Sequence, residues 1–192
     1  MKNNISQDYV EQLAVLHEKK TFGTAARLPE DLQKIIKEKN IKSILDFGSG
    51  KGNTTLAIKE KFPDIKVYSY DPVTSPIDLP DQVDLVYSSD VLEHVEPNQL
   101  DQTLENLFNI SNHQYHYIAC HIAKKTLSDG RNAHLIIEPG TWWEQKMKDN
   151  LGDSWEMKHS ESKTKVGKVK KPFMGSRTIV QEKYLVILER TK

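Results

Sequence analysis

The sequence predicts an α/β fold in which helices and mostly parallel strands alternate in a doubly wound sheet. A short apolar strand at residues 42–47 runs into a glycine-rich turn, Gly48–Gly52. A helical segment follows, and a second short strand at residues 65–70 ends at the acidic residue Asp71. This order of strand, tight turn, helix and acid-terminated strand is typical of nucleoside-binding α/β sheets.

The other elements are predicted from apolar periodicity and from Pro and Gly residues at element ends. We expect helices at residues 7–19, from Pro29, from Gly52 to Phe62, from Pro97 and after Gly140, and strands at residues 83–88, 115–120 and twice within the tail 155–190, the last at 183–188.

The connection from Asp71 to Asp84 is short, because only 12 residues lie between them. A crossover through a helix and another strand needs more residues than this. We therefore expect a Rossmann-like sheet of about six strands, mostly parallel with an antiparallel last strand, that lacks the usual third strand.

Length and composition predict one domain over residues 1–192. We expect N-terminal helices (1–40) that cover the site, a cofactor-binding core (41–122), and an acceptor-side loop with C-terminal strands (123–192). Net charge is +0, which argues against a nucleic-acid or membrane-surface partner. The single cysteine, Cys120, and the lack of a long apolar run favour a cytoplasmic protein with no membrane partner.

The glycine turn predicts a nucleoside ligand, although a turn without a ligand is the alternative reading. Gly48, Gly50 and Gly52 allow the backbone to turn sharply and to approach a ligand closely. Asp71 is placed to bind ribose hydroxyls. The dinucleotide motif fails because Asn53 stands where its third glycine is needed. A phosphate-binding P-loop would need an upstream glycine and a hydroxyl residue after the lysine, and both are missing.

Three segments resemble motifs of the class I methyltransferases that depend on S-adenosylmethionine (SAM). Leu45–Gly52 resembles their first motif, Tyr70-Asp71 their second, and Val83–Val95 their fourth strand with the turn after it. This resemblance covers about residues 40–125. More narrowly, His121–Trp143 resembles small stand-alone methyltransferases of bacteria and phages, whose acceptors are mostly unassigned.

The resemblance implies SAM as the cofactor and S-adenosylhomocysteine as its product. The expected cofactor contacts are Asp46, Gly48, Ser49, Gly50, Gly52, Asp71, Pro72, Ser89, Asp90 and Val91. Because the sulfonium already makes the methyl group electrophilic, the protein must mainly align the acceptor and exclude water. A general base is needed only if the acceptor must lose a proton.

The acceptor is expected beyond the carboxyl ends of the strands. His121 and His94 follow two of these strands and are the candidate catalytic residues, with structural hydrogen bonding as the alternative for each. The expected acceptor contacts are Glu93, Lys125, Arg131, Asn132, His134 and Trp143. Residues 129–134 could equally form a plain tight turn, and one of Trp142 and Trp143 should be core. Asp90, Glu93, His94 and His121 could converge on a metal ion, but no spacing matches a metal signature, so no metal is expected.

A small polar acceptor, such as a sugar, carboxylate or amine metabolite, fits the sequence best. DNA amino methylation typically uses Asp/Asn-Pro-Pro-aromatic, and here Ser89–Leu92 stands in its place. Cys120 lacks the Pro-Cys context of pyrimidine C5 enzymes. Two alternatives remain. One is a SAM-binding regulatory module without turnover, and the other is an RNA methyltransferase, which the lysines between Lys158 and Lys171 favour.

Overall fold

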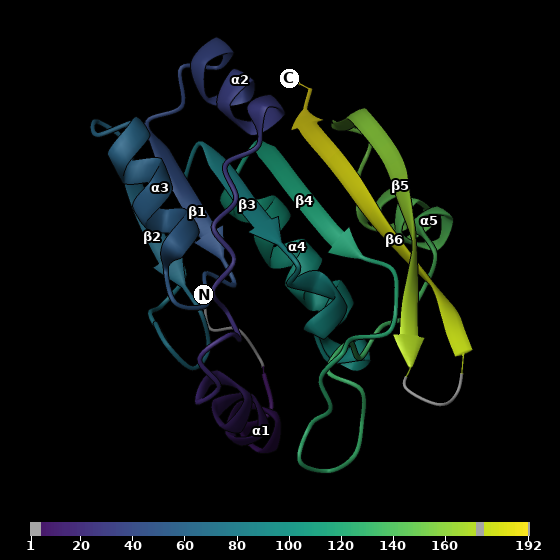
Figure 1. Ribbon diagram of the computed structural model, residues 1–192. Coiled ribbons are helices and arrows are strands. Elements are labelled where there is room, and N and C mark those ends of the chain that lie inside the picture. Colours follow the sequence, from purple (N-terminus) through teal and green to yellow (C-terminus); the bar gives the residue numbers. More distant parts are fainter. Residues whose placement is uncertain (1–4, 172–174, 192) are drawn as a thin grey trace.

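The computed structural model describes residues 5–171 and 175–191. Its centre is a six-stranded sheet in the order β2-β1-β3-β4-β6-β5 (Figure 1). The strands are β1 (Ser43–Phe47), β2 (Lys66–Tyr70), β3 (Leu85–Ser89), β4 (His113–Ala119), β5 (Trp155–Lys171) and β6 (Gly175–Arg190). Strands β1 to β4 are parallel, whereas β6 is antiparallel to β4 and to β5. The predicted fold class is confirmed, including the antiparallel last strand.

The missing third strand is also confirmed. β2 lies at the edge of the sheet, and between β2 and β3 the described chain forms only an isolated bridge, Asp71 to Ser75. The short connection passes directly to β3, so among the described strands none covers the outer edge of β2.

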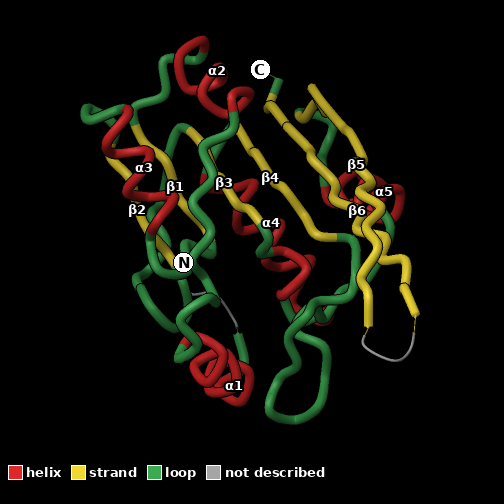
Figure 2. Tube along the Cα trace, in the orientation of Figure 1, coloured by secondary structure: helices red, strands yellow, loops and turns green. Residues whose placement is uncertain are grey.

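Helices cover both faces of the sheet, as Figure 2 shows. They are α1 (Gln7–His17), α2 (Glu30–Glu38), α3 (Asn53–Lys61), α4 (Leu100–Ile110) and α5 (Gly140–Asn150), with short 3-10 turns at Leu92–His94 and Pro97–Gln99. α2 and α3 pack on one face through Leu32, Ile36 and Ile58. α4 and α5 pack on the other face, where Leu104 and Met147 are fully buried. Burying each such side chain contributes about 1.5–3 kcal/mol.

α1 lies apart from these layers, beyond the carboxyl ends of the parallel strands (Figure 1). Its Tyr9, Leu13 and Leu16 pack against Leu127 and Ala133 of the loop that follows β4. The helix therefore covers the end of the sheet at which nucleoside ligands bind in this kind of fold.

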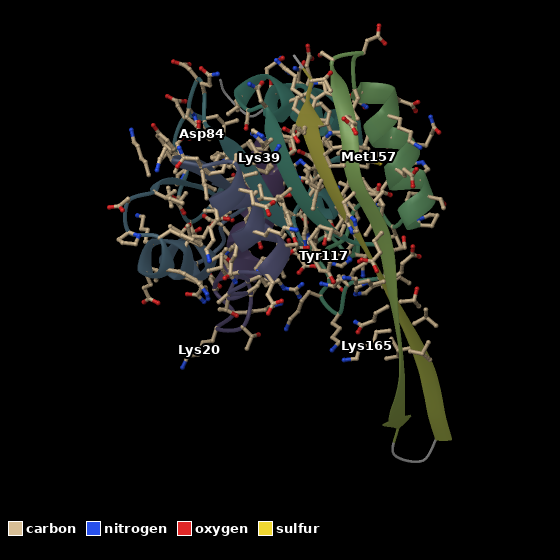
Figure 3. The ribbon with its side chains drawn as sticks, turned by 90° about the horizontal axis from the view of Figure 1, so that it is seen from above. Lys20, Lys39, Asp84, Tyr117, Met157 and Lys165 are labelled. Atoms are coloured by element: carbon tan, nitrogen blue, oxygen red, sulfur yellow. The ribbon has the colours of Figure 1, made fainter. Side chains whose placement is uncertain are left out.

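The C-terminal tail forms a long hairpin. β5 and β6 pair from Trp155 with Arg190 to Lys171 with Gly175. Figure 3 shows this hairpin extending beyond the body, with Lys165 on the projecting part. The sequence predicted two strands but placed the last at residues 183–188, which is too short. Beyond the core, β6 has no regular apolar pattern by which the sequence could predict a strand. The β5–β6 ladder forms there through backbone hydrogen bonds, which do not depend on apolar side chains.

None of the helices in the described ranges combines the length and the apolar character needed to cross a membrane.

Candidate active site

A cavity of about 290 Å³ lies at the carboxyl ends of the parallel strands. Its walls are the turn after β1, the end of β2, the turn after β3, the N-terminal part of α4, and the segment from Ile5 to Ala25 that includes α1. Its volume is close to the lower end of the range for small-molecule sites, about 300–1,000 Å³.

The glycine turn is fixed to both neighbouring strands. The backbone N–H groups of Gly48 and Ser49 donate to the carbonyl of Tyr70, at 2.8 and 2.9 Å. A Cβ on Gly48 would come within 2.4 Å of the Val91 side chain, and the residue has φ +76°. Packing and backbone conformation both require glycine here, so the turn stays close to the ends of β2 and β3.

The N-terminal segment crosses over the same turn. Lys51 N–H donates to the Gly23 carbonyl at 2.7 Å. A Cβ on Gly50 would lie 2.6 Å from that carbonyl oxygen. The segment before α2 therefore roofs the glycine turn and closes one side of the cavity.

Asp71 lines the cavity and is 5% exposed. Its carboxylate accepts hydrogen bonds from the N–H groups of Gly50 (3.1 Å), Val73 and Thr74 (both 3.0 Å). His17 Nε2 lies 3.9 Å away. In this structure Asp71 therefore holds the glycine turn in shape, and its contact with a ribose stays a prediction.

Asp46 is a buried carboxyl group on the cavity wall, and it accepts a hydrogen bond from Thr55 Oγ1 at 2.6 Å. Burial raises the pKa of Asp46 to about 6 from 3.8. A raised pKa means that the folded state binds the proton more tightly. The protonated Asp46 therefore favours the folded state. This contribution to the free energy of unfolding is fully present below the unfolded pKa of Asp46, 3.8, and is lost as the pH rises through about 6.

Asp90 follows β3 with φ +55°, a strained conformation for a residue with a Cβ. Its N–H donates to the Tyr117 carbonyl at 2.8 Å. Its carboxylate is ion-paired with Lys183 and, at 3.4 Å, with Arg27. The strained turn therefore holds a carboxylate at the cavity wall between two cations.

His94 is half-buried and also lines the cavity. The Nδ1 atom of His94 lies 2.6 Å from the Ala133 carbonyl, and Tyr9 Oη donates a hydrogen bond to the His94 backbone carbonyl at 2.6 Å. Burial, followed by the neighbouring ring of His134, lowers the pKa of His94 to about 4. The ring is thus neutral at neutral pH, with Nδ1 protonated and Nε2 available as an acceptor.

The adjacent Glu93 is completely buried. Burial raises the pKa of Glu93 to about 8, and the nearby Asp90 carboxylate adds to this shift. One carboxylate oxygen accepts from Ala119 N–H at 3.1 Å. The Glu93 side chain points into the protein beside His134, whose Nε2 is 4.0 Å away.

The cavity contains polar atoms that fit a polar ligand. In the described parts of the chain, Ser49 Oγ and His17 Nδ1 are buried without a hydrogen-bond partner. Both residues line the cavity. Buried polar atoms normally have partners, so these two atoms are suited to a nucleoside and amino-acid ligand such as SAM.

The residues predicted to contact the cofactor come together with one exception. The cavity is lined by Asp46, Gly48, Ser49, Gly50, Asp71, Pro72, Ser89, Asp90 and Val91. Gly52 does not line it; this residue instead precedes α3 in a left-handed conformation and has open space around its Cα.

The predicted catalytic and acceptor residues are only partly brought together. His94 lines the cavity, whereas His121 does not. The His121 ring lies against β6, with Nδ1 2.9 Å from the Glu182 carbonyl and Nε2 3.3 Å from Gln181 Nε2. Glu93 and His134 lie beside His94 behind the wall.

Residues Lys125, Arg131 and Asn132 stay within the loop after β4 and do not line the cavity. Arg131 pairs with Asp129 at 2.6 Å, and the Asn132 amide bonds the backbone of Ala123 through both its oxygen and its nitrogen at 3.0 Å. Arg131 and Asn132 thus make contacts that shape the loop, and their contact with an acceptor stays a prediction.

The expectation for Trp143 is wrong. This side chain is 0% exposed and lies in the core between α5 and the sheet. Trp142 is the half-buried member of the pair. Adjacent helical residues point about 100° apart, and sequence gave no means to choose between them.

Several cavity residues were not singled out from the sequence. They include Tyr9, Leu13, His17, Phe22 and Thr103. The only available signal was the apolar stripe of residues 7–19, which predicts a covering helix but does not show which side chains meet a ligand.

Comparison with known proteins agrees with this geometry. A family model described as "Methyltransferase domain" matches residues 17–165. No curated protein matches the chain. Solved structures with similar folds include 1,6-didemethyltoxoflavin-N1-methyltransferase from Burkholderia thailandensis, with a TM-score of 0.62, 13% identity, and coverage of 100% of this chain and 94% of that chain.

Two further structures share the fold. One comes from work on the conversion of a disulfide bond into a thioacetal group during echinomycin biosynthesis. It has a TM-score of 0.55 and 13% identity, and the match covers 95% of this chain and 93% of that chain. TehB from Haemophilus influenzae has a TM-score of 0.52, 15% identity and coverage of 88% of this chain and 64% of that chain. Because the family model spans most of the sequence, the chain belongs to the methyltransferase-domain family and is a class I SAM-dependent methyltransferase.

Proposed function

We propose that the protein methylates a small polar molecule held in the cavity, by in-line displacement from SAM. The observation that carries this proposal is that one cavity joins two different walls. The glycine turn and Asp71 form a polar wall suited to the cofactor, and Tyr9, Leu13 and Phe22 form a wall suited to a small acceptor. The B. thailandensis structure, which contains 1,6-didemethyltoxoflavin and S-adenosylhomocysteine, supports a small-molecule acceptor in this fold.

The residues of the two walls have different tasks. When bound, SAM supplies an electrophilic methyl group. The orphaned Ser49 Oγ and His17 Nδ1 and the carboxylate of Asp46 offer polar contacts to the cofactor. α1 and the segment around Gly23 exclude water, which strengthens electrostatic interactions in the site.

His94 is the residue best placed to orient the acceptor. Its neutral ring can accept a hydrogen bond from an acceptor hydroxyl or amine through Nε2. With a pKa of about 4, the ring does not retain a proton at neutral pH. His94 therefore aligns the acceptor and is not its general base.

The test is a methylation assay with isotopically labelled SAM. Separate reactions receive the small-molecule fraction of a cell extract and total RNA, and mass spectrometry identifies what gains the label. We expect label in the small-molecule fraction alone. Label in RNA would support the RNA methyltransferase alternative, and no transfer to any pool despite SAM binding would support a regulatory module.

A pair of variants on α1 tests the acceptor wall. Leu13 lines the cavity, whereas Val15 on the same helix is 47% exposed. Leu13→Ala should raise the acceptor KM by about 10-fold or more, as expected for losing on the order of 1.5–3 kcal/mol of apolar contact. SAM affinity should stay the same, and Val15→Ala should change neither value. Equal effects of both variants on KM would contradict this assignment.

A further inference from the structure

Three side chains with metal-ligand atoms converge beside the cavity. One ring nitrogen of His94, one of His134 and one carboxylate oxygen of Glu93 lie within 4.8 Å of one another. His134 Nε2 and Glu93 Oε1 are 4.0 Å apart, which is too far for a hydrogen bond. The groups therefore face one another without satisfying one another.

Both imidazole rings are oriented by backbone carbonyl groups. His94 Nδ1 bonds the carbonyl of Ala133, and His134 Nδ1 bonds the carbonyl of His121. A carbonyl oxygen can only accept, so Nδ1 of each ring carries the proton and Nε2 keeps its lone pair. Histidines that bind metals are usually held in this way, with the far nitrogen donating to a carbonyl or a carboxylate.

Glu93 supplies the second, independent observation. Its side chain is 0% exposed, and Oε2 is buried without a hydrogen-bond partner among the described residues. Within the same residues, no lysine or arginine nitrogen comes within 4.0 Å of this carboxylate. A buried carboxylate is expensive unless it is paired with a cation or protonated. The cluster thus offers one buried carboxyl group and two neutral imidazole rings as ligands, but lacks the cation that would join them.

We propose that Glu93, His94 and His134 bind one divalent transition-metal ion at the wall of the cavity. Two imidazole nitrogens and one carboxylate favour zinc, iron or a similar ion over magnesium and calcium, which prefer oxygen ligands. In a tetrahedral site with bonds of about 2.1 Å, ligand atoms lie about 3.4 Å apart. Side-chain movements of about 1 Å would therefore complete the site.

The location of the site gives it a role in methyl transfer, a role that rests on the proposed function. Because His94 lines the cavity, a remaining coordination position can open toward the acceptor. With the ion bound, the lone pair of His94 Nε2 is occupied, and the ion replaces the direct hydrogen bond from the acceptor: it would bind an acceptor hydroxyl or carboxylate oxygen and fix its position. Local sequence spacing does not bring His134 into this group, because it comes from a loop far along the chain from Glu93-His94.

Calorimetric titration of the untagged, chelator-treated protein tests metal binding. Zinc chloride should bind at one ion per chain, and magnesium chloride should bind at least 100-fold more weakly. His134→Ala should weaken zinc binding by about 100-fold or more, since losing even an outer partner of a ligand costs about 10–100-fold. The control is His159→Ala, which removes an exposed histidine on β5, 3.5 Å from Glu161, that could hold zinc at the surface. We expect no change from this control.

A second measurement needs no variant and so does not depend on whether His134→Ala folds. Cobalt(II) added to the wild-type protein should give the visible absorption of a nitrogen-ligated site, and zinc should abolish it. No zinc binding by the wild type, no cobalt spectrum, or equal binding by a folded His134→Ala variant would overturn the proposal. Both measurements are made without SAM or acceptor, so a negative result leaves methyl transfer to be judged by the labelling assay alone.

Discussion

Replacing Gly50 with alanine tests whether the N-terminal segment holds the cofactor turn in place. Gly50 has φ +55°, and its Cα packs directly on the Gly23 backbone. A Cβ at this position would meet Gly23 O at 2.6 Å and Gly23 Cα at 2.8 Å. Neither contact can be relieved by rotating a side chain, so the two backbone segments must separate.

Gly52 provides the matched control for this variant. It also has a positive φ, +76°, but a Cβ there would meet nothing within 4 Å. Gly52→Ala should therefore cost only the backbone strain of a left-handed conformation, about 1–2 kcal/mol. Gly50→Ala should cost the same strain plus overpacking of about 1–3 kcal/mol, giving about 2–5 kcal/mol in all.

Urea unfolding of the two variants gives both free energies of unfolding by linear extrapolation. Calorimetry with SAM then shows whether separation of the turn from Gly23 weakens binding, as we expect for Gly50→Ala and much less for Gly52→Ala. Equal losses of stability and equal SAM affinities in the two variants would show that contact with Gly23 contributes nothing, and the roof assigned to this segment would be wrong.

Three other predictions concern polar residues at or near the site. Asp46→Asn should raise the free energy of unfolding at pH 7–8 by up to about 3 kcal/mol, because burial raises the pKa of Asp46 from 3.8 to about 6. The same variant should have little effect below pH 4. A stability curve parallel to that of the wild type across this pH range would refute the buried-carboxyl assignment. Asp71→Asn should weaken SAM binding by about 1–3 kcal/mol, because it removes one of the two carboxylate oxygens that accept from the N–H groups of Gly50, Val73 and Thr74. Unchanged affinity by calorimetry would remove Asp71 from the site. His94→Ala should lower kcat/KM by about 10–100-fold, and His121→Ala should lower it less, because only His94 lines the cavity. A larger loss of kcat/KM in His121→Ala would restore His121 as the main catalytic histidine.

Much of the fold could be predicted because its signals are local. The glycine turn, the acid after β2 and the Pro residues before α2 and α4 mark element ends directly in the sequence. The missing strand follows from chain length alone, since a crossover requires more residues than the connection offers. The length of β5 and β6 was not predictable in this way, because the outer half of β5 is rich in lysine, the outer half of β6 begins with Gly and Ser, and the two are held by pairing with each other.

The site was predictable only where the backbone determines position. Residues in the turns after β1, β2 and β3 point to the cavity because parallel strands end at one edge. His121 follows β4 at the same edge, yet its ring lies against β6. A residue just past a strand can turn to either side, and the choice depends on a neighbouring strand more than 60 residues later, which local sequence does not reveal.

The two walls of the cavity come from different parts of the chain, and this division bears on specificity. The cofactor wall is built by turns whose geometry is constrained by the sheet, so substitutions there must preserve backbone contacts such as Gly48 with Val91. The proposed acceptor wall is built mainly by α1, which is attached through Tyr9 to the His94 carbonyl and through Ser6 to Glu96. Such hydrogen bonds contribute only about 0.5–1.5 kcal/mol each. Side chains of α1 that face the cavity can therefore change without disturbing the sheet, and differences in acceptor among proteins of this fold should concentrate there.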